Sequence, residues 1–124
     1  MGQDIVADAL NQIMNSKKAG KNFVVVNRYS NLLLKLLDLA QKEGYIDRYE
    51  IKGNNLRIEF SKLNCCKAIK PRFYVKIGGI DKYVRRYLPS RTFGVIIIST
   101  NKGLITNSQA YEKNIGGSLI AYFY

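Results

Sequence analysis

The segment Ser99-Thr100-Asn101-Lys102-Gly103 holds the residues whose types and spacing best suit a binding chemistry. Its hydroxyl, amide and ammonium groups follow directly on the apolar run 95–98, which is typical of a buried strand. Such groups donate hydrogen bonds to phosphate and ribose oxygens, and Gly103 lets the backbone approach a partner closely. None of them acts as an acid or base near neutral pH. The segment therefore favours contact with a polyanion over bond cleavage, and an ordinary polar hairpin loop is the alternative.

The adjacent glycines Gly116 and Gly117 form a second candidate site. A glycine pair makes a sharp turn and leaves backbone N–H groups open to an anionic ligand. The pattern is not a dinucleotide-binding fingerprint, because no G-x-G-x-x-G follows a strand. Taken alone, the glycine pair favours the simpler interpretation of a turn without a ligand.

Catalytic chemistry has little support in this sequence. The chain has no histidine, which excludes catalytic triads and metal sites that depend on imidazole. Asp4 and Asp8 lie one helical turn apart, a spacing that also suits a helix cap followed by a polar face. Cys65 and Cys66 are adjacent, which disfavours a disulfide of normal geometry, so we expect reduced structural thiols. We expect no enzyme activity, no metal and no cofactor.

The charge of the chain is strongly basic and unevenly distributed. The net charge is +11, of which residues 1–60 carry +2 and residues 61–124 carry +9. An excess of this size attracts nucleic acid or anionic lipid, and the sequence has no apolar run of about 18 residues that would span a membrane. Basic and aromatic residues alternate in the second half, as is common on RNA-binding surfaces. The basic members are Lys67, Lys70, Arg72, Lys76, Lys82, Arg85, Arg86 and Arg91, and the aromatic members are Phe73, Tyr74, Tyr83, Tyr87 and Phe93, of which we assign Phe73 and Phe93 to the core.

Elements that could position these residues follow from periodicity and from helix and turn signals. In the first half, helices are expected over 4–18, capped by Asp4, and from Ser30 to a stop at Gly44. Strands are expected over 23–26, 45–51 and 56–60, the last two joined by a turn at 53–55. The helices should cover one face of this sheet.

The second half reads as a mainly antiparallel β unit with short helices. A connector is expected over 62–70, ending at Pro71, followed by strands over 72–77, 93–98 and 119–124, and Leu104-Ile105 continues the chain after the polar segment. Short helices should begin at Asp81 and at a cap formed by Thr106 or Asn107. We therefore expect an α+β fold of two small halves: an N-terminal α/β domain over 1–65, built as helix, strand, helix and hairpin, and a C-terminal β-rich RNA-binding domain over 66–124.

Several short motifs stand in a characteristic order and spacing along the chain. They are the helix Asp8–Ile13 with Asn15, the turn Glu43-Gly44-Tyr45-Ile46, Lys70-Pro71-Arg72-Phe73, Leu88–Gly94, Ser99-Thr100-x-x-Gly103 with Thr106, and Gly116-Gly117-x-Leu119. Together they resemble the S8 family of small-subunit ribosomal proteins in its archaeal and eukaryotic form. The similarity covers nearly the whole chain, and the aromatic ending 121–124 is closer to the archaeal form.

The resemblance implies a structural role in the small ribosomal subunit, in the cytoplasm, with direct binding to the central domain of small-subunit ribosomal RNA and contacts to neighbouring ribosomal proteins. It implies no membrane and no small-molecule substrate. RNA-binding positions carried over or chosen for their charge are Ser99, Thr100, Asn101, Lys102, Gly103, Gly116, Gly117, Asn11, Asn15, Lys17, Ser30, Lys70, Arg72 and Arg91.

Two positions depart from the family pattern, and two other functions remain open. Asn101 stands where serine is usual, and Asn31 stands where lysine or arginine is common. The alternatives are an RNA-binding regulator that acts off the ribosome and a small RNA-processing enzyme that would depend on Asp4 or Asp8.

Overall fold

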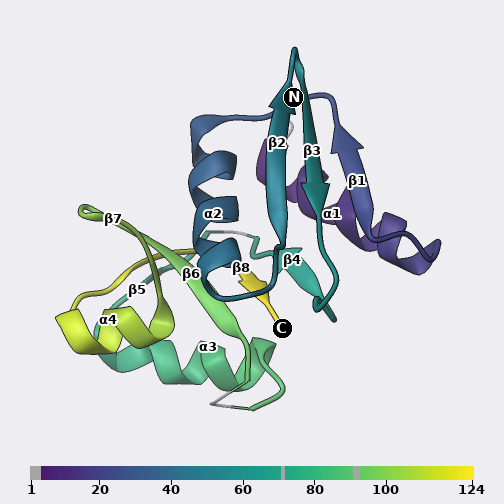
Figure 1. Cartoon of the computed structure of the whole chain (residues 1–124). Coiled ribbons are helices and arrows are strands. Elements are labelled where there is room, and N and C mark those ends of the chain that lie inside the picture. The colour runs from purple at the N-terminus through teal and green to yellow at the C-terminus, as the bar shows by residue number, and fades with distance from the viewer. Residues whose placement is uncertain (1–3, 71, 91–92) are drawn as a thin grey trace. The chain divides into compact units, whose positions relative to one another are not determined.

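The computed structural model describes residues 4–70, 72–90 and 93–124 of the chain (Figure 1). Within them lie four α-helices and antiparallel β-sheets, so the expected α+β class is confirmed. The chain divides into two compact units, Met1–Lys67 and Ala68–Tyr124, called unit 1 and unit 2 below. The candidate residue Arg91 lies outside the described residues.

Unit 1 contains two helices and a three-stranded antiparallel sheet in the order β1-β3-β2. Both helices begin where a side chain accepts hydrogen bonds from the first turn, as the sequence predicts. The Asp4 carboxylate accepts from the Val6 and Ala7 N–H groups at 3.0 and 3.3 Å, and Ser30 Oγ accepts from the Leu33 N–H at 3.2 Å. The elements are α1 (Ile5–Lys18), β1 (Phe23–Val26), α2 (Asn31–Lys42), β2 (Arg48–Lys52) and β3 (Asn55–Glu59).

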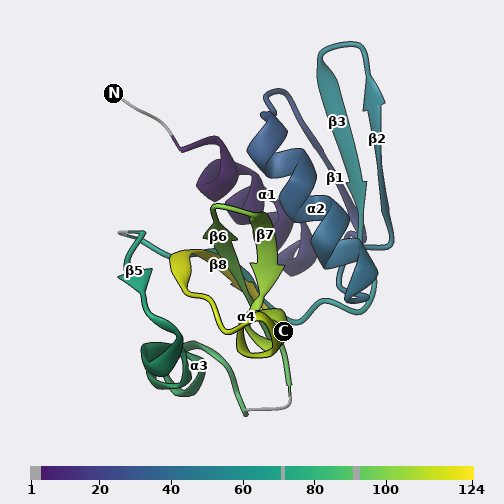
Figure 2. The same ribbon diagram turned by 90° about the vertical axis from the view of Figure 1, so that its left-hand side faces the viewer.

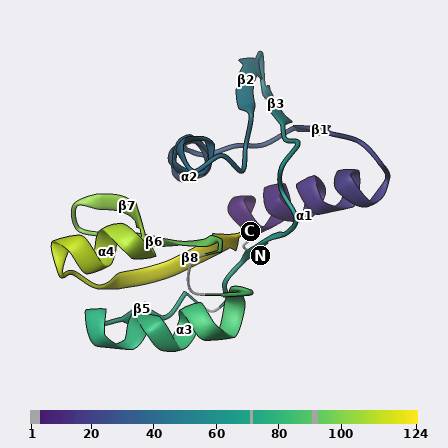
Figure 3. The same cartoon turned by 60° about the horizontal axis from the view of Figure 1, so that its bottom comes forward.

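The core of unit 1 lies between the sheet and its two helices. Alternate strand residues are buried and their neighbours are more exposed, which is the pattern of a sheet covered on one face. Both helices lie on that side of the sheet (Figure 3), as expected. The residues that fill this core include Leu10, Ile13, Val24, Val26, Leu33, Leu36, Leu37, Leu56 and Ile58.

The β2–β3 hairpin is shorter at its base and tighter at its tip than the sequence suggests. Tyr45 and Ile46 donate their N–H groups to the Ala40 carbonyl at the end of α2, so they complete the helix end instead of joining the strand. At the tip, Lys52 pairs with Asn55, which leaves Gly53 and Asn54 as a two-residue turn with Gly53 at φ +62°. The tip of the hairpin extends beyond the start of α2 (Figure 2).

Unit 2 is built on a sheet in the order β4-β8-β6-β7, with β5 also pairing with β8. Its elements are β4 (Cys66–Ala68), where the two units meet in sequence, β5 (Tyr74–Val75), η1 (Ile77–Gly79), α3 (Ile80–Tyr87), β6 (Val95–Thr100), β7 (Gly103–Thr106), α4 (Asn107–Lys113) and β8 (Gly117–Phe123).

Two expectations for the start of unit 2 are wrong. The expected connector 62–70 contains β4, and beside it the Ile69 N–H donates to the Ile120 carbonyl at 2.9 Å. The expected strand 72–77 is reduced to the two residues of β5. It ends there because the 3₁₀ turn η1 leads directly into α3, one residue earlier than the expected start at Asp81.

Helices α3 and α4 cover one face of the unit 2 sheet (Figure 1). Ile80 and Val84 of α3 and Ala110 of α4 pack with the sheet residues Ile96 and Ile98, all fully or almost fully buried. The buried Asn107 side chain also accepts a hydrogen bond from the Ile96 N–H at 3.1 Å, which fixes α4 to β6.

The placement of Phe93 in the core is wrong, whereas Phe73 does pack against the core. Phe93 is 45% exposed because it precedes β6, in a bridge with Ser90. Gly94 follows with φ +99°, and a Cβ there would lie 2.8 Å from the Phe123 carbonyl oxygen. The chain therefore turns at Gly94 before the sheet begins, and Phe93 stays outside it.

We expect Thr106→Ala to lower the melting temperature by about 4 °C, equivalent to about 1 kcal/mol. Thr106 Oγ1 accepts from the Gln109 N–H at 3.2 Å, and Gln109 Oε1 accepts in turn from the Thr106 N–H at 3.0 Å, a complete capping box. Thermal unfolding followed by circular dichroism measures the change. Ser108→Ala, at an exposed position of the same helix, is the control; equal melting temperatures for the two variants would show that the box contributes nothing.

We expect the stability of the chain to fall between about pH 10 and pH 12 in a way that depends on Tyr49. The Tyr49 hydroxyl donates to the Asp38 carboxylate, which raises the pKa of Tyr49 to about 12. Because the folded form holds this proton more tightly, the contribution is complete below pH 10 and is lost as the pH rises through 12. Urea unfolding at pH 9, 10, 11 and 12 should show a shallower decline for Tyr49→Phe. A decline as steep as that of the unmodified chain would count against the bond.

Candidate RNA interface

The polar segment from Ser99 to Gly103 is a hairpin end rather than an open loop. Ser99 and Thr100 are the last residues of β6, Gly103 is the first residue of β7, and Thr100 pairs with Gly103. The turn therefore consists of Asn101 and Lys102 alone, and both side chains are exposed. The expected end of the strand at Ile98 is wrong by two residues, because the cross-strand pairing continues through the polar side chains.

Thr100 is committed to the turn itself. Its hydroxyl donates to the Gly103 carbonyl at 2.8 Å and accepts from the Lys102 N–H at 3.1 Å. With its single proton already used, the hydroxyl has no donor left for a phosphate. Thr100 therefore holds the shape of the hairpin end, while Asn101 and Lys102 carry the groups that a partner can reach.

Gly103 is required for its backbone conformation rather than for lack of space. Its φ of +110° is a conformation that other residues rarely adopt, and a Cβ built there would meet nothing within 4 Å. A two-residue turn followed by such a glycine is a common hairpin closure. The exposed backbone at Gly103 remains open to close approach by a ligand.

Ser99 belongs to a row of side chains that crosses four strands. Ser99 on β6 pairs with Leu104 on β7 and with Ser118 on β8, and Ser118 pairs in turn with Tyr74 on β5. Residues directly opposite each other place their side chains on the same face of a sheet. The neighbouring residues Val75, Ile98, Ile105 and Leu119 point into the core under α3 and α4, so the row lies on the other face. Tyr74 is 71% exposed, and the other three are half-buried.

Gly116 and Gly117 are positions of close backbone contact. A Cβ on Gly117 would lie 2.3 Å from the Ser99 carbonyl oxygen, and one on Gly116 would lie 2.2 Å from the Val75 carbonyl oxygen. Gly117 is the first residue of β8, where it pairs with Val75. The pair therefore lets β8 approach β6 and β5, and the expectation of a turn that ends before the last strand is correct only for Gly116.

Basic residues dominate unit 2 around this row. Residues 68–124 hold nine Lys and Arg residues against Asp81 and Glu112 alone. Asp81 forms an ion pair with Arg85 at 2.8 Å, on α3. Lys70, Arg72 and Lys76 are exposed in the segments that flank β5, whose residue Tyr74 ends the row. The electrostatic character of unit 2 is therefore suited to phosphate.

Unit 1 carries the other four expected positions. Asn11, Asn15 and Lys17 are exposed on α1, and the two asparagines are one helical turn apart on the same face. Ser30 is half-buried at the start of α2, where its oxygen accepts from the Leu33 N–H and its proton can still be donated.

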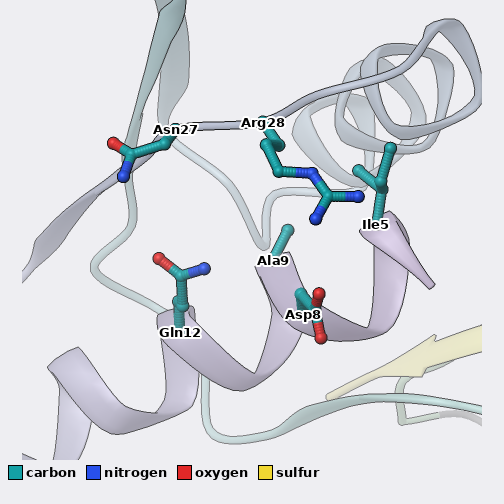
Figure 4. A pocket seen from close by; sticks show the side chains of 6 residues that line it. All are labelled: Ile5, Asp8, Ala9, Gln12, Asn27 and Arg28. Atoms are coloured by element: carbon teal, nitrogen blue, oxygen red, sulfur yellow. The ribbon is translucent and has the colours of Figure 1, made fainter. Parts of the chain in front are cut away.

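A polar hollow of about 200 Å³ lies between α1 and the segment that leads to Ser30 (Figure 4). Asp8 and Gln12 extend from α1, Asn27 and Arg28 come from the opposite segment, and Ile5 and Ala9 complete the lining. These groups donate and accept hydrogen bonds but include neither a nucleophile nor a set of metal ligands.

The described part of the chain has no arrangement that points to catalysis. No group of three or more His, Cys, Asp or Glu residues there could hold a metal ion. The resolved pKa shifts all move away from neutrality. Glu59 pairs with Arg48 and Arg57, which lowers the pKa of Glu59, and the pair with Glu59 raises the pKa of Arg48. The hydrogen bond to Asp38 raises the pKa of Tyr49. Burial raises the pKa of the Cys66 thiol. Among the described residues, none of the helices is both long and apolar enough to cross a membrane.

Ser118, Tyr74 and Leu104 join the site only through the structure. Tyr74 appears among the aromatic residues of the second half, but nothing in the sequence connects it to Ser99. The connection depends on the pairing of β5, β8 and β6, which are far apart in the chain. Alternation within 117–123 would have placed Ser118 on the same face as Tyr122, but the extra residue Ile120 interrupts the pattern, so the sequence holds no signal for its position.

Comparison with known proteins agrees with the motifs. The sequence pattern of ribosomal protein S8 matches residues 4–124. The small ribosomal subunit protein uS8 of Nanoarchaeum equitans is 45% identical, with all of both chains covered. That of Picrophilus torridus is 37% identical, again with all of both chains covered, and protein uS8A of Schizosaccharomyces pombe is 35% identical over 98% of each. The resemblance seen in the sequence is thereby confirmed: the chain belongs to the ribosomal protein S8 family.

Proposed function

We propose that this chain is a structural component of the small ribosomal subunit that binds the central domain of its ribosomal RNA. The relatives are small-subunit ribosomal proteins over their full length, which supports a structural rather than a catalytic role. Neighbouring ribosomal proteins are its other partners, and the cytoplasmic ribosome is its location. The binding helps to assemble and stabilise the platform of the subunit.

The observation that carries this proposal is the hydroxyl row beside an exposed hairpin end. Ser99, Ser118 and Tyr74 present three hydroxyl groups on one face of the sheet, next to the exposed Asn101 and Lys102. Small hydroxyl and amide groups suit the 2′-hydroxyls and base edges of the shallow RNA minor groove. Lys102 and the basic residues near β5 supply the phosphate contacts that give affinity without sequence preference.

The residues divide into those that touch RNA and those that shape the contact. Ser99, Asn101 and Lys102 make contacts, with Lys70, Arg72 and Arg91 adding charge. Thr100 and Gly103 fix the hairpin end, and Gly116 and Gly117 bring β8 beside it. Unit 1 adds a second contact through Asn11, Asn15, Lys17 and Ser30. This contact is weaker than in relatives because Asn31 lacks the positive charge common at its position.

Two measurements test the proposal directly. The tagged chain should sediment with small subunits in a sucrose gradient, and the purified chain should bind a central-domain RNA fragment more tightly than fragments of the other domains. Sedimentation only as free protein would contradict the structural role. Equal affinity for all fragments would contradict the assignment to the central domain.

We expect Ser99→Ala to weaken binding to the central-domain fragment about fivefold and to leave binding to random RNA almost unchanged. The substitution removes one hydroxyl that makes shape-specific contacts, worth about 1 kcal/mol. Filter binding at fixed salt measures both affinities. Ser108→Ala, an exposed serine on α4, is the matched control. Equal losses on the two RNAs would mean that Ser99 makes no specific contact.

We expect Asn101→Ala to lower affinity for the same fragment, whereas Asn101→Ser retains at least part of it. Asn101 is exposed at the tip of the hairpin, so neither substitution should disturb the fold. Serine keeps a hydrogen-bonding group with shorter reach, and alanine removes it. If both variants bind like the unmodified chain in filter-binding titrations, Asn101 does not face the RNA.

A further inference from the structure

Six aromatic rings form a continuous strip across unit 2. The rings of Phe73, Tyr83, Tyr87, Tyr122 and Tyr124 follow one another with successive centroid distances of 5.8, 6.2, 5.1 and 6.1 Å. Their planes are inclined by no more than 29°, and Phe93 closes the end at 6.3 Å from Tyr124. All members except the exposed Phe93 are half-buried against the core. We call this set the aromatic strip.

The aromatic strip lies away from the hairpin end along the same sheet. The hydroxyl row crosses β8 at Ser118, whereas the strip meets β8 at Tyr122, which pairs with Ile96 on β6. Four strand residues correspond to roughly 13 Å. On α3, Tyr83 and Tyr87 are one turn apart and continue the strip along the helix. The strip is therefore a second surface and not an extension of the first.

Two cations of α3 lie against the strip. The Lys82 ammonium is 5.8 Å from the centre of the Tyr83 ring, and the Arg86 guanidinium is 5.6 Å from the centre of the Tyr87 ring. Both side chains are exposed, and no carboxylate in the described part of the chain lies within ion-pairing distance of either. The neighbouring Arg85 differs, because Asp81 offsets its charge at 2.8 Å.

The geometry of the rings restricts what such a surface can bind. Near-parallel stacking places the ring faces against one another, so a base cannot insert between them without breaking the stack. What remains for a partner is ring edges, phenol groups and the two cations. Phenol hydroxyls and exposed Lys and Arg groups are typical donors to phosphate and sugar oxygens, contacts that carry no base sequence.

We propose that the aromatic strip, with Lys82 and Arg86, binds the sugar–phosphate backbone of a second RNA segment. The charge of unit 2, with only two carboxylate side chains, suits a polyanion, and RNA is favoured over an acidic protein segment because the proposed function already brings unit 2 to RNA. The inference rests on that proposed function for its RNA partner. The two surfaces differ in what they contribute to binding. The strip should add affinity for any RNA, whereas the hairpin end should add selectivity for the central-domain RNA.

The test compares two adjacent arginines of the same helix. RNA affinity is measured by filter binding from 50 to 300 mM KCl, on the central-domain fragment and on random RNA, for Arg86→Gln and Arg85→Gln. Removing one phosphate contact should reduce the slope of log affinity against log salt by about 1 for Arg86→Gln on both RNAs. Arg85→Gln removes the same charge and should change the slope much less.

A second variant tests the phenol groups without disturbing the stack. The double variant Tyr83→Phe and Tyr87→Phe retains every ring, and we expect it to lose about tenfold in affinity for both RNAs. Tyr111→Phe, which alters an exposed tyrosine of α4, is the control. Melting temperatures of all variants confirm that they remain folded.

The outcomes separate this proposal from the previous one. If Arg86→Gln and Arg85→Gln change the salt slope equally, or if the double tyrosine variant binds like the unmodified chain, the strip does not contact RNA. If the strip binds an acidic protein segment instead of RNA, the tyrosine variant should bind RNA as tightly as the unmodified chain does. If the unmodified chain shows no preference for the central-domain fragment but the strip variants behave as expected, the strip proposal stands and the proposed function falls.

Discussion

The close approach of β8 to β6 at Gly117 is the constraint on which the rest of unit 2 depends. Any side chain there would collide with the Ser99 backbone, since even a Cβ would lie 2.3 Å from its carbonyl oxygen. The same contact sets the register that pairs Ser99 with Ser118. The buried residues Ile98 and Leu119 are thereby directed to α3 and α4, and the hydroxyl groups to the opposite face. One backbone contact thus separates core from candidate interface.

Within the hairpin, the polar side chains have different tasks despite their similar chemistry. The Thr100 hydroxyl donates one hydrogen bond to a neighbouring backbone group and accepts another, and these two bonds make the turn rigid. Asn101 and Lys102 are left exposed at the tip that this turn creates. A rigid end reduces the conformational entropy that is lost when RNA is bound. The candidate interface therefore depends on residues that fix the hairpin end as much as on those exposed at it.

Local signals in the sequence predict much of the fold, because they act within a few residues. The caps at Asp4, Ser30 and Thr106 each join a side chain to an N–H group of the next turn, so composition and spacing reveal them. Strand β4 has only three residues and no alternating pattern of its own, so no local signal in the sequence marks it. Phe93 has the hydrophobicity of a core residue, but the turn at Gly94 places it outside the sheet.

The candidate site, too, could be predicted only where its residues are neighbours in the sequence. The polar run at 99–103 is recognisable from its composition, whereas the row through Ser118 and Tyr74 depends on strand pairing between distant segments. A register shift between Ile97 and Ile98 makes this pairing harder to infer, because β8 carries the extra residue Ile120 opposite it. Counting residues back along β8 without that irregularity would place Ser118 opposite the wrong partner and on the wrong face.

The uneven charge of the chain has a consequence for its life before assembly. Unit 2 has nine basic residues and only two acidic ones, so like charges repel one another in the folded state whenever no polyanion is present. Binding RNA removes this repulsion and adds the free energy of mass action to the stability of the fold. The newly made, unbound chain is therefore the least stable form of the protein and the one most exposed to proteolysis.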